Sequence, residues 1–282
     1  MHAGNALDAG QPPPLASLAR TVCATNAADP VQVAVVATSH AELHDRIALA
    51  RRFASGPGVY MTSGVAGPLA FIFPGQGSQK VGMMGELFVA FPALQRWLRL
   101  GRAYADKLFP GSAFSPESRA AQQAALTDTR VAQPALGLCG RAMSDLLASV
   151  GVVASHAAGH SYGELVALSY AGVLRDEDFL ALSAARGEHI LAAAGDDPGT
   201  MAAVAASPAD VERALADQPG IVLANRNAPG QTVISGPKAD VAAALVKLES
   251  LRIAARPIAV ACAFHSPVVA GAADTLAAYL EN

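Results

Sequence analysis

The chain carries few charged residues and no long apolar run. Among its 282 residues 15% are charged, and the formal net charge is −3. Nucleic acids and anionic membranes bind basic surfaces, and this charge balance provides none. A membrane helix needs roughly 18 consecutive apolar residues, and a signal peptide needs a charged start followed by an apolar core. The sequence has neither, so we expect no nucleic acid and no membrane among its partners.

Cysteine is also scarce, and the patterns that hold metals or nucleotides are missing. Three cysteines lie far apart in the sequence: Cys23, Cys139 and Cys262. They form neither a disulfide framework nor a C-x-x-C metal site. There is no G-x-x-x-x-G-K-[ST], and Lys80 replaces the third glycine of a dinucleotide fingerprint. The sequence thus predicts no metal, no permanently bound cofactor and a cytoplasmic location. Hydrophobic residues make up 52% of the chain, which is enough to build a large core.

The most informative motif is the G-x-S-x-G pattern from Gly159 to Gly163. This pattern is typical of the sharp strand-to-helix turn that presents a serine hydroxyl as a nucleophile, here Ser161. An apolar stretch at 152–158 predicts the strand, and residues 164–170 predict the helix. We interpret His160, which precedes the serine, as structural. An ordinary glycine turn is the alternative interpretation.

A glycine-rich loop supplies a second part of the predicted site. The apolar run Leu69–Phe73 predicts a buried strand, and it ends in the loop 74–79, which reads PGQGSQ. Glycines at Gly75 and Gly77 allow backbone N–H groups to approach a ligand. The loop is therefore interpreted as a source of oxyanion-hole donors rather than as a phosphate-binding loop.

His265 is the candidate base. It follows the apolar run 257–260, so we expect it at the end of a strand. A histidine beside apolar residues is usually structural, but serine needs a base within hydrogen-bond reach to act as a nucleophile. Ser161 and His265 are far apart in the sequence, so only the tertiary fold can bring them together.

Five segments, in this order, resemble malonyl-CoA:acyl carrier protein transacylases and the acyltransferase domains of polyketide and fatty acid synthases. They are FIFPGQGSQ, GHSYGE, the helix with Ala185-Arg186-Gly187, ANRNAPGQTVISG and AFHSP. The resemblance covers residues 67–282. The form GHSYGELVAL is most similar to the acyltransferase domains of iterative, enediyne-type polyketide synthases.

The resemblance implies a role for each matching residue. Ser161 would be the nucleophile and His265 the base, and the backbone N–H groups of Gln76 and Tyr162 would form the oxyanion hole. Arg186 would bind the free carboxylate of a malonyl or methylmalonyl unit. Without the resemblance, Arg186 would be interpreted as an arginine on a solvated helix face.

Selection between malonyl and methylmalonyl rests on the residue before the histidine. Phenylalanine at this position accompanies malonyl selection in modular synthases, and Phe264 occupies it. Because Phe264 is present, we expect malonyl-CoA as the substrate. The usual form is H-A-F-H, and Cys262, in place of the first histidine, departs from it. The resemblance also implies two kinds of partner: an acyl carrier protein with its phosphopantetheine arm, and neighbouring polyketide synthase domains such as a ketosynthase.

The predicted fold is α/β. We expect a linker at 1–66, a large α/β-hydrolase-like subdomain with a parallel sheet at 67–195 and 261–282, and a ferredoxin-like subdomain at 196–260. The last range has the element order βαββαβ, with strands at 200–206, 220–224, 231–235 and 255–260. Within the linker, a strand at 31–36 precedes a helix at 41–54.

Acyltransferases of this type normally continue for some tens of residues beyond A-F-H-S-P, whereas this sequence stops at Asn282 after one expected helix, 268–280. We therefore expect the last piece of the large subdomain to be missing. Two alternative functions remain open: a serine hydrolase or thioesterase, and a truncated, inactive docking domain. Arg186 and the PGQGSQ loop argue against a hydrolase. The joint presence of serine, histidine and arginine argues against a docking domain.

Overall fold

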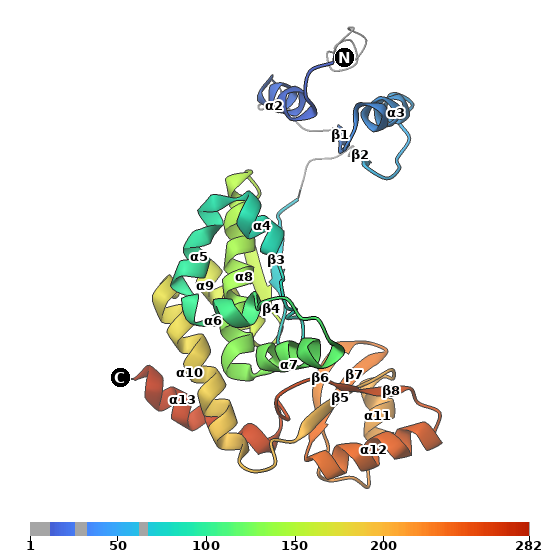
Figure 1. Cartoon of the computed structure of the whole chain (residues 1–282). Helices are drawn as coiled ribbons and strands as arrows, with labels where there is room; N and C mark the ends of the chain where they lie inside the picture. The colour runs from blue at the N-terminus through green and yellow to red at the C-terminus, as the bar shows by residue number, and fades with distance from the viewer. Residues whose placement is uncertain (1–11, 26–32, 62–66, 282) are drawn as a thin grey trace. The chain divides into compact units, whose positions relative to one another are not determined.

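The computed structural model describes residues 12–25, 33–61 and 67–281. The chain divides into two units, Met1–Gly67 and Pro68–Asn282 (Figure 1). Residues 1–11, 26–32 and 62–66 of the expected linker lie outside the described residues, and they include the first two residues of the strand expected at 31–36.

The first unit contains short elements. They are α2 (Leu15–Thr25), β1 (Val33–Val35), α3 (His40–Arg51) and β2 (Val59–Met61). β1 pairs with β2 in antiparallel fashion, with Val33 opposite Met61. Ser39 begins α3 because its side chain accepts a hydrogen bond from the backbone N–H of Glu42. The sequence predicted β1 and α3 but not α2 or β2.

The second unit begins with a part that is rich in helices. Its elements up to residue 194 are β3 (Ala70–Phe73), α4 (Gly85–Ala90), η1 (Pro92–Leu94), α5 (Gln95–Leu100), α6 (Arg102–Leu108), α7 (Pro116–Thr127), α8 (Thr129–Ser149), β4 (His156–Gly159), α9 (Gly163–Tyr170) and α10 (Asp176–Ala194). The chain returns to this part after residue 258 with η2 (Pro267–Val269) and α13 (Ala272–Leu280). We call residues 68–199 and 259–281 the helix-rich part.

A pair of parallel strands and one long helix organise the helix-rich part. β3 pairs with β4, so that Phe73 lies opposite Gly159. Phe73 packs in a core cluster with side chains of α8 and α9, among them Leu138 and Val166. Asp128 begins α8 by accepting a hydrogen bond from the backbone N–H of Arg130. The carboxyl ends of β3 and β4 therefore lie side by side.

Two expectations for these strands need correction. β4 begins at His156, not at Val152, and Val153 is exposed. β3 is not buried on both faces, because the side chain of Ile72 is 77% exposed. Among the described residues the parallel sheet contains two strands, which is smaller than the sheet expected for a large hydrolase-like subdomain.

The chain then forms a four-stranded antiparallel sheet with two helices. The elements are β5 (Thr200–Val204), α11 (Pro208–Ala214), β6 (Val222–Ala228), β7 (Gln231–Gly236), α12 (Lys238–Ser250) and β8 (Ala255–Ile258). The strand order in the sheet is β6-β7-β5-β8 (Figure 1). We call residues 200–258 the four-stranded part. β6 extends to Ala228, four residues beyond the expected end of this strand.

Alternating side chains of this sheet face two different cores. Ala202, Val204 and Ile234 pack with α11 and α12. On the other face, Met201 and Val233 pack with residues of the helix-rich part, including Ile190 of α10 and Phe264. This alternation follows from the two-residue period of a strand. The second cluster joins the two parts. β8 ends at Ile258 and not at residue 260, so His265 lies in a turn of the segment that follows and not at the end of a strand, as the sequence had led us to expect.

Candidate active site

Ser161 lies in a sharp turn between β4 and α9, in a left-handed backbone conformation with φ of 54°. Close packing fixes this turn. A Cβ on Gly159 would lie 1.9 Å from the carbonyl carbon of Gly163, and a Cβ on Gly163 would lie 2.1 Å from the carbonyl oxygen of Phe73. Both positions therefore require glycine. The helix begins two residues after Ser161, and the turn carries the serine at the carboxyl end of the two strands.

His265 reaches the serine from the chain that returns from the four-stranded part. Its Nε2 lies 2.8 Å from the Oγ of Ser161, across a separation of 104 residues. Its backbone is also left-handed, with φ of 57°. Neighbouring hydrogen bonds hold this segment: the N–H of Ala263 donates to the carbonyl of Pro198 at 2.7 Å, and the hydroxyl of Ser266 donates to the carbonyl of Ala263 at 2.7 Å. The two predicted catalytic side chains are thus in hydrogen-bond contact.

The surroundings of His265 favour a neutral imidazole. Partial burial lowers the pKa of His265 below its ordinary value of 6.5, and the positive charge of Arg186 and the neighbouring His160 lower this pKa further. Glu164 acts in the opposite direction with a smaller effect. A neutral imidazole has a free nitrogen lone pair, so His265 can accept the Ser161 proton near neutral pH.

Two residues that line the cavity around Ser161 have backbone N–H groups with no acceptor among the described residues. Gln76 and Tyr162 both line the cavity that contains Ser161, and neither amide N–H donates to another residue in the described part of the chain. The side chain of Tyr162 points into the core, where its hydroxyl lies 2.8 Å from the hydroxyl of Ser183. Burial raises the pKa of Tyr162, so this phenol stays protonated. Tyr162 therefore offers its backbone rather than its side chain to the cavity.

Arg186 lies on α10 and faces the same cavity. Its Nη1 donates to the side-chain oxygen of Gln133 at 2.8 Å. Within the described ranges no carboxylate lies at salt-bridge distance from Arg186. Burial lowers the pKa of Arg186, but an arginine keeps its charge in proteins. A partly buried guanidinium without an anionic partner can bind an acidic group of a ligand.

The cavity that these residues share has a volume of 140 Å³ and is lined by both parts of the second unit. The helix-rich part contributes Ser161, His265 and Arg186. The four-stranded part contributes apolar side chains and two asparagines of β6, Asn225 and Asn227. The strand expected at 220–224 ended before both asparagines. The structure places them in a strand, facing the cavity.

A hydrogen bond connects the two walls of the cavity. The Nε2 of His160 lies 3.0 Å from the Oδ1 of Asn227. His160 also packs against the glycine-rich loop, since a Cβ on Gly75 would lie 2.6 Å from the carbonyl oxygen of His160. His160 therefore contacts both the loop and the four-stranded part, in agreement with a structural role.

Phe264 lines the cavity and packs in the same core cluster as Cys262. Cys262 is fully buried in the cluster that joins the two parts. Burial raises the pKa of its thiol to about 12, so this thiol is neutral. A small buried thiol therefore stands where the modular pattern has histidine.

Gln133 is a polar residue of this site that sequence reasoning missed. It is fully buried in α8 and contacts Arg186. Its position within the apolar sequence VAQPALGL at 131–138 could have indicated it. A glutamine in such a segment is buried, and a buried amide needs a hydrogen-bond partner.

No group of metal-binding side chains occurs in the parts of the chain that are described. Nor does any helix there have the length and apolar character needed to cross a membrane.

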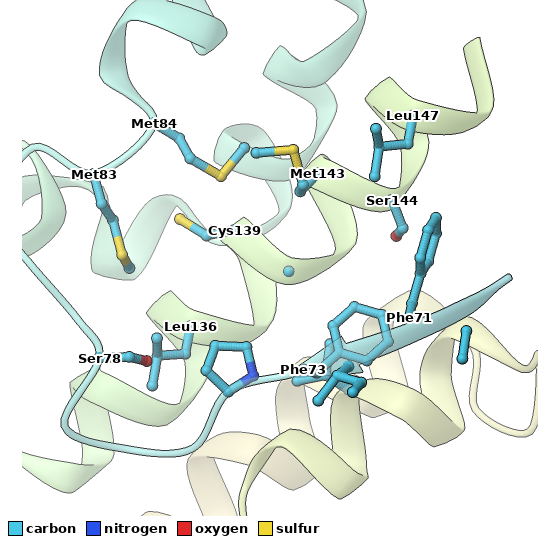
Figure 2. Close-up of a pocket in the computed structure, with 15 residues that line it drawn as sticks. Phe71, Phe73, Ser78, Met83, Met84, Leu136, Cys139, Met143, Ser144 and Leu147 are labelled. Atoms are coloured by element: carbon cyan, nitrogen blue, oxygen red, sulfur yellow. The ribbon is translucent and has the colours of Figure 1, made fainter. Parts of the chain in front are cut away.

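A larger cavity of 360 Å³ lies between β3 and α8 (Figure 2). Its labelled side chains are mainly apolar, such as Phe71, Met84 and Met143, and none is charged.

Comparison with known proteins decides the family. The model of the acyl transferase domain matches residues 70–282. The chain belongs to the acyl transferase domain family. This assignment agrees with the resemblance found in the sequence.

Relatives of this acyl transferase include single enzymes and large synthases. The malonyl CoA-acyl carrier protein transacylase of Synechocystis sp. is 36% identical over 209 residues, which is 74% of this chain and 67% of that protein. Polyketide synthase GfsE of Streptomyces halstedii is 40% identical over 223 residues, which is 77% of this chain and 6% of that synthase. The chain thus spans a small fraction of the length of the synthases it matches.

A solved structure matches almost the whole acyl transferase chain. The acyltransferase domain from the second module of the salinomycin polyketide synthase has a TM-score of 0.72 and 30% identity. The match covers 98% of this chain and 65% of that domain. The predicted α/β class is confirmed at this level.

Proposed function

We propose that this acyl transferase moves a malonyl group from CoA to the phosphopantetheine thiol of an acyl carrier protein. The observation that carries the proposal is the 2.8 Å contact between Ser161 and His265 in a cavity that Arg186 also lines. The names of the relatives support the substrate and the carrier protein, and the synthases among them support a role in polyketide or fatty acid synthesis.

The first half of the reaction loads the enzyme. His265 takes the proton of Ser161 while the serine oxygen attacks the thioester carbonyl of malonyl-CoA. The carbon–sulfur bond breaks, and the CoA thiolate leaves with the proton that His265 returns. In the second half, His265 deprotonates the carrier thiol, whose sulfur attacks the malonyl-serine ester, and Ser161 recovers its proton. One thioester replaces another, so no nucleotide is consumed.

Each half passes through a tetrahedral intermediate with a negative oxygen. The free N–H groups of Gln76 and Tyr162 are the proposed donors to this oxygen. One such donor contributes on the order of 10²–10³ in rate. Because both donors are backbone groups, substitution of either side chain would test the loop shape rather than the hydrogen bond.

Arg186 is the proposed partner of the malonyl carboxylate. A charge-assisted pair of this kind contributes roughly 1.5–3 kcal/mol, which favours malonyl over acetyl by about 10- to 150-fold. Phe264 would crowd the α-methyl branch of methylmalonyl. One methyl group contributes only about 1–3 kcal/mol, so the second preference is the weaker one.

We also propose the architecture that the sequence suggested. The helix-rich part corresponds to an α/β-hydrolase-like subdomain, and the four-stranded part, with its strand order β6-β7-β5-β8, to an inserted ferredoxin-like one. Residues 1–66 would be part of a linker that precedes the domain. A ketosynthase is the expected neighbour in a synthase. The free thiols Cys23, Cys139 and Cys262 agree with a reducing, cytoplasmic setting.

Acylation of the protein by malonyl-CoA tests this function. We expect short incubation followed by intact-mass measurement and peptide mapping to show a malonyl adduct on Ser161. Ser161→Ala should abolish the adduct because it removes the attacking oxygen. Arg186→Ala should reduce malonyl loading relative to acetyl loading by about 10-fold or more.

The contrary outcomes are clear. Steady release of free malonate in the absence of a carrier protein would favour a hydrolase. A protein that binds malonyl-CoA but never becomes acylated would favour a docking domain. Malonyl preference that survives Arg186→Ala would remove the proposed selectivity.

A further inference from the structure

A continuous chain of hydrogen bonds runs behind the cavity from Arg186 to the glycine-rich loop. The guanidinium of Arg186 donates to Oε1 of Gln133 at 2.8 Å. Nε2 of Gln133 donates to the hydroxyl of Thr129 at 2.8 Å. That hydroxyl donates to Oε1 of Gln76 at 2.7 Å. Nε2 of Gln76 then donates to the backbone carbonyl of Thr127 at 3.3 Å.

The direction of every bond in this chain is fixed. Arg186 can only donate, so the Gln133 oxygen accepts and its amide nitrogen must donate onward. The Thr129 hydroxyl accepts this bond and has one proton left for Gln76. Gln133 and Thr129 are both fully buried. Removing one member therefore leaves a buried polar group without a partner, and water cannot replace it at low cost.

A close helix contact makes the chain possible. Gly187, the residue after Arg186, packs against the start of α8: a Cβ there would lie 2.8 Å from the Cα of Arg130 and 2.9 Å from the carbonyl oxygen of Thr129. The absence of this Cβ lets α10 approach α8 closely. Gln133 lies one helical turn after Thr129, so both side chains lie on the same face of α8.

We propose that Gln133 and Thr129 are positioning residues that couple the arginine for the substrate carboxylate to the loop that supplies the oxyanion donor at Gln76. Gln133 holds the guanidinium at the orientation a carboxylate needs. Thr129 transmits this position to Gln76, whose side chain anchors the loop. This inference rests on the proposed function and adds a way in which acyl-group selection and oxyanion stabilisation depend on one structural unit.

Two substitutions of similar size to the native side chains test the coupling. Gln133→Met removes both hydrogen bonds of the amide and should lower the ratio of malonyl to acetyl loading about 10-fold. Thr129→Val removes the hydroxyl and should lower loading by both thioesters about 5-fold or more, because it releases the loop. Thr129→Ser restores the hydroxyl and should recover most of the rate. Gln123→Met, at an exposed position of α7, is the matched control.

The measurement is single-turnover acylation of the whole 282-residue chain by malonyl-CoA and by acetyl-CoA, with each variant's thermal unfolding recorded alongside. Both loading rates of a variant are measured on one sample and scale with the same folded fraction. The ratio of malonyl to acetyl loading therefore does not depend on that fraction. A double-mutant cycle isolates the coupling. Once Arg186→Ala is present, adding Gln133→Met should leave the ratio unchanged.

The results distinguish a failure of the proposed coupling from a failure of the proposed malonyl transfer. If the wild-type chain forms no acyl adduct, the proposed function fails and the coupling fails with it. If the wild-type chain loads malonyl but Gln133→Met keeps the wild-type ratio, only the inference is overturned. A further fall of the ratio when Gln133→Met is added to Arg186→Ala would also overturn it, because Gln133 would then act independently of the arginine.

Discussion

Ser161 and His265 both occupy a backbone conformation that most residues avoid, with φ near 55°: 54° and 57°. Such positions cost on the order of 1–3 kcal/mol each and persist where surrounding contacts enforce them. Glycine contacts enforce the first position, and the hydrogen bonds of Ala263 and Ser266 accompany the second. The side chains of these two residues touch each other. The contacts that hold these two backbone positions therefore also hold the 2.8 Å distance between the Oγ of Ser161 and the Nε2 of His265.

The charge of Arg186 should be visible in the pH dependence of acylation. Only neutral His265 can accept a proton, so the rate falls as the pH falls through the pKa of His265. Burial is the first cause that lowers this pKa, and Arg186 is the second. Arg186→Met removes the second cause, so the pKa of His265 should rise and the loss of rate should begin at higher pH. Burial persists, so the midpoint should stay below the wholly solvated value.

Acetyl-CoA is the appropriate substrate for this experiment because it has no carboxylate that needs Arg186. We would measure single-turnover acylation of Ser161 from about pH 5 to about pH 8, the interval in which histidines titrate. Arg175→Met, at an exposed arginine paired with Asp178, is the control and should leave the midpoint in place. A midpoint that moves to lower pH in Arg186→Met would contradict the electrostatic explanation.

At the scale of elements, the nucleophile turn depends on contacts between backbones rather than between side chains. Gly163→Ala would force a Cβ to within 2.1 Å of the Phe73 carbonyl oxygen, so β3 or α9 must move. We expect a loss of about 1–3 kcal/mol in the free energy of unfolding, together with loss of Ser161 acylation. Denaturant unfolding and malonyl loading measure the two effects.

Gly111→Ala is the matched control for that change, because a Cβ at Gly111 meets nothing within 4 Å and its φ is not in the left-handed region. It should change neither stability nor loading. Equal effects of both substitutions would mean that the close contact at Gly163 does not control the turn.

The elements also indicate how far the sequence could lead. The turn at Ser161 was predictable because glycine spacing and a local strand–helix switch lie within a few residues. The predicted strand ended before Asn225 and Asn227, because polar residues before Pro229-Gly230 resemble a turn. In the structure this strand continues because it pairs with β7, a contact that the local sequence does not report. The missing prediction was Gln133. Its partner Thr129 lies one helical turn away, but its partner Arg186 lies 53 residues further along the chain, and no local pattern reports that contact.

At the scale of the whole second unit, the cavity exists only because two parts of the chain face each other. The helix-rich part holds Ser161, and the four-stranded part lies between it and His265 along the sequence. The family assignment and the α/β class were predictable from ordered motifs. The roles of Ser161, His265, Gln76, Tyr162, Arg186 and Phe264 stay predictions, which the acylation experiments address.

The contact between His160 and Asn227 allows a test of how the two walls cooperate. Asn227→Ala removes the acceptor of this 3.0 Å hydrogen bond, so the loop-side residue His160 loses its connection to β6. Without it, the N–H groups beside Ser161 should be less well positioned. We expect the rate of malonyl loading to fall by about 5-fold, roughly the effect of losing one neutral hydrogen bond.

Asn227→Asp keeps an acceptor oxygen near the same position and should retain most of the rate, because the imidazole of His160 can donate to a carboxylate as it does to an amide. The free energy of unfolding should change little in either variant, since the side chains of His160 and Asn227 are exposed. If Asn227→Ala loads malonyl at the wild-type rate, the four-stranded part contributes only a wall and does not position the residues beside Ser161. If both variants lose rate equally, the asparagine acts through its own amide nitrogen, and the bond to His160 is not the reason.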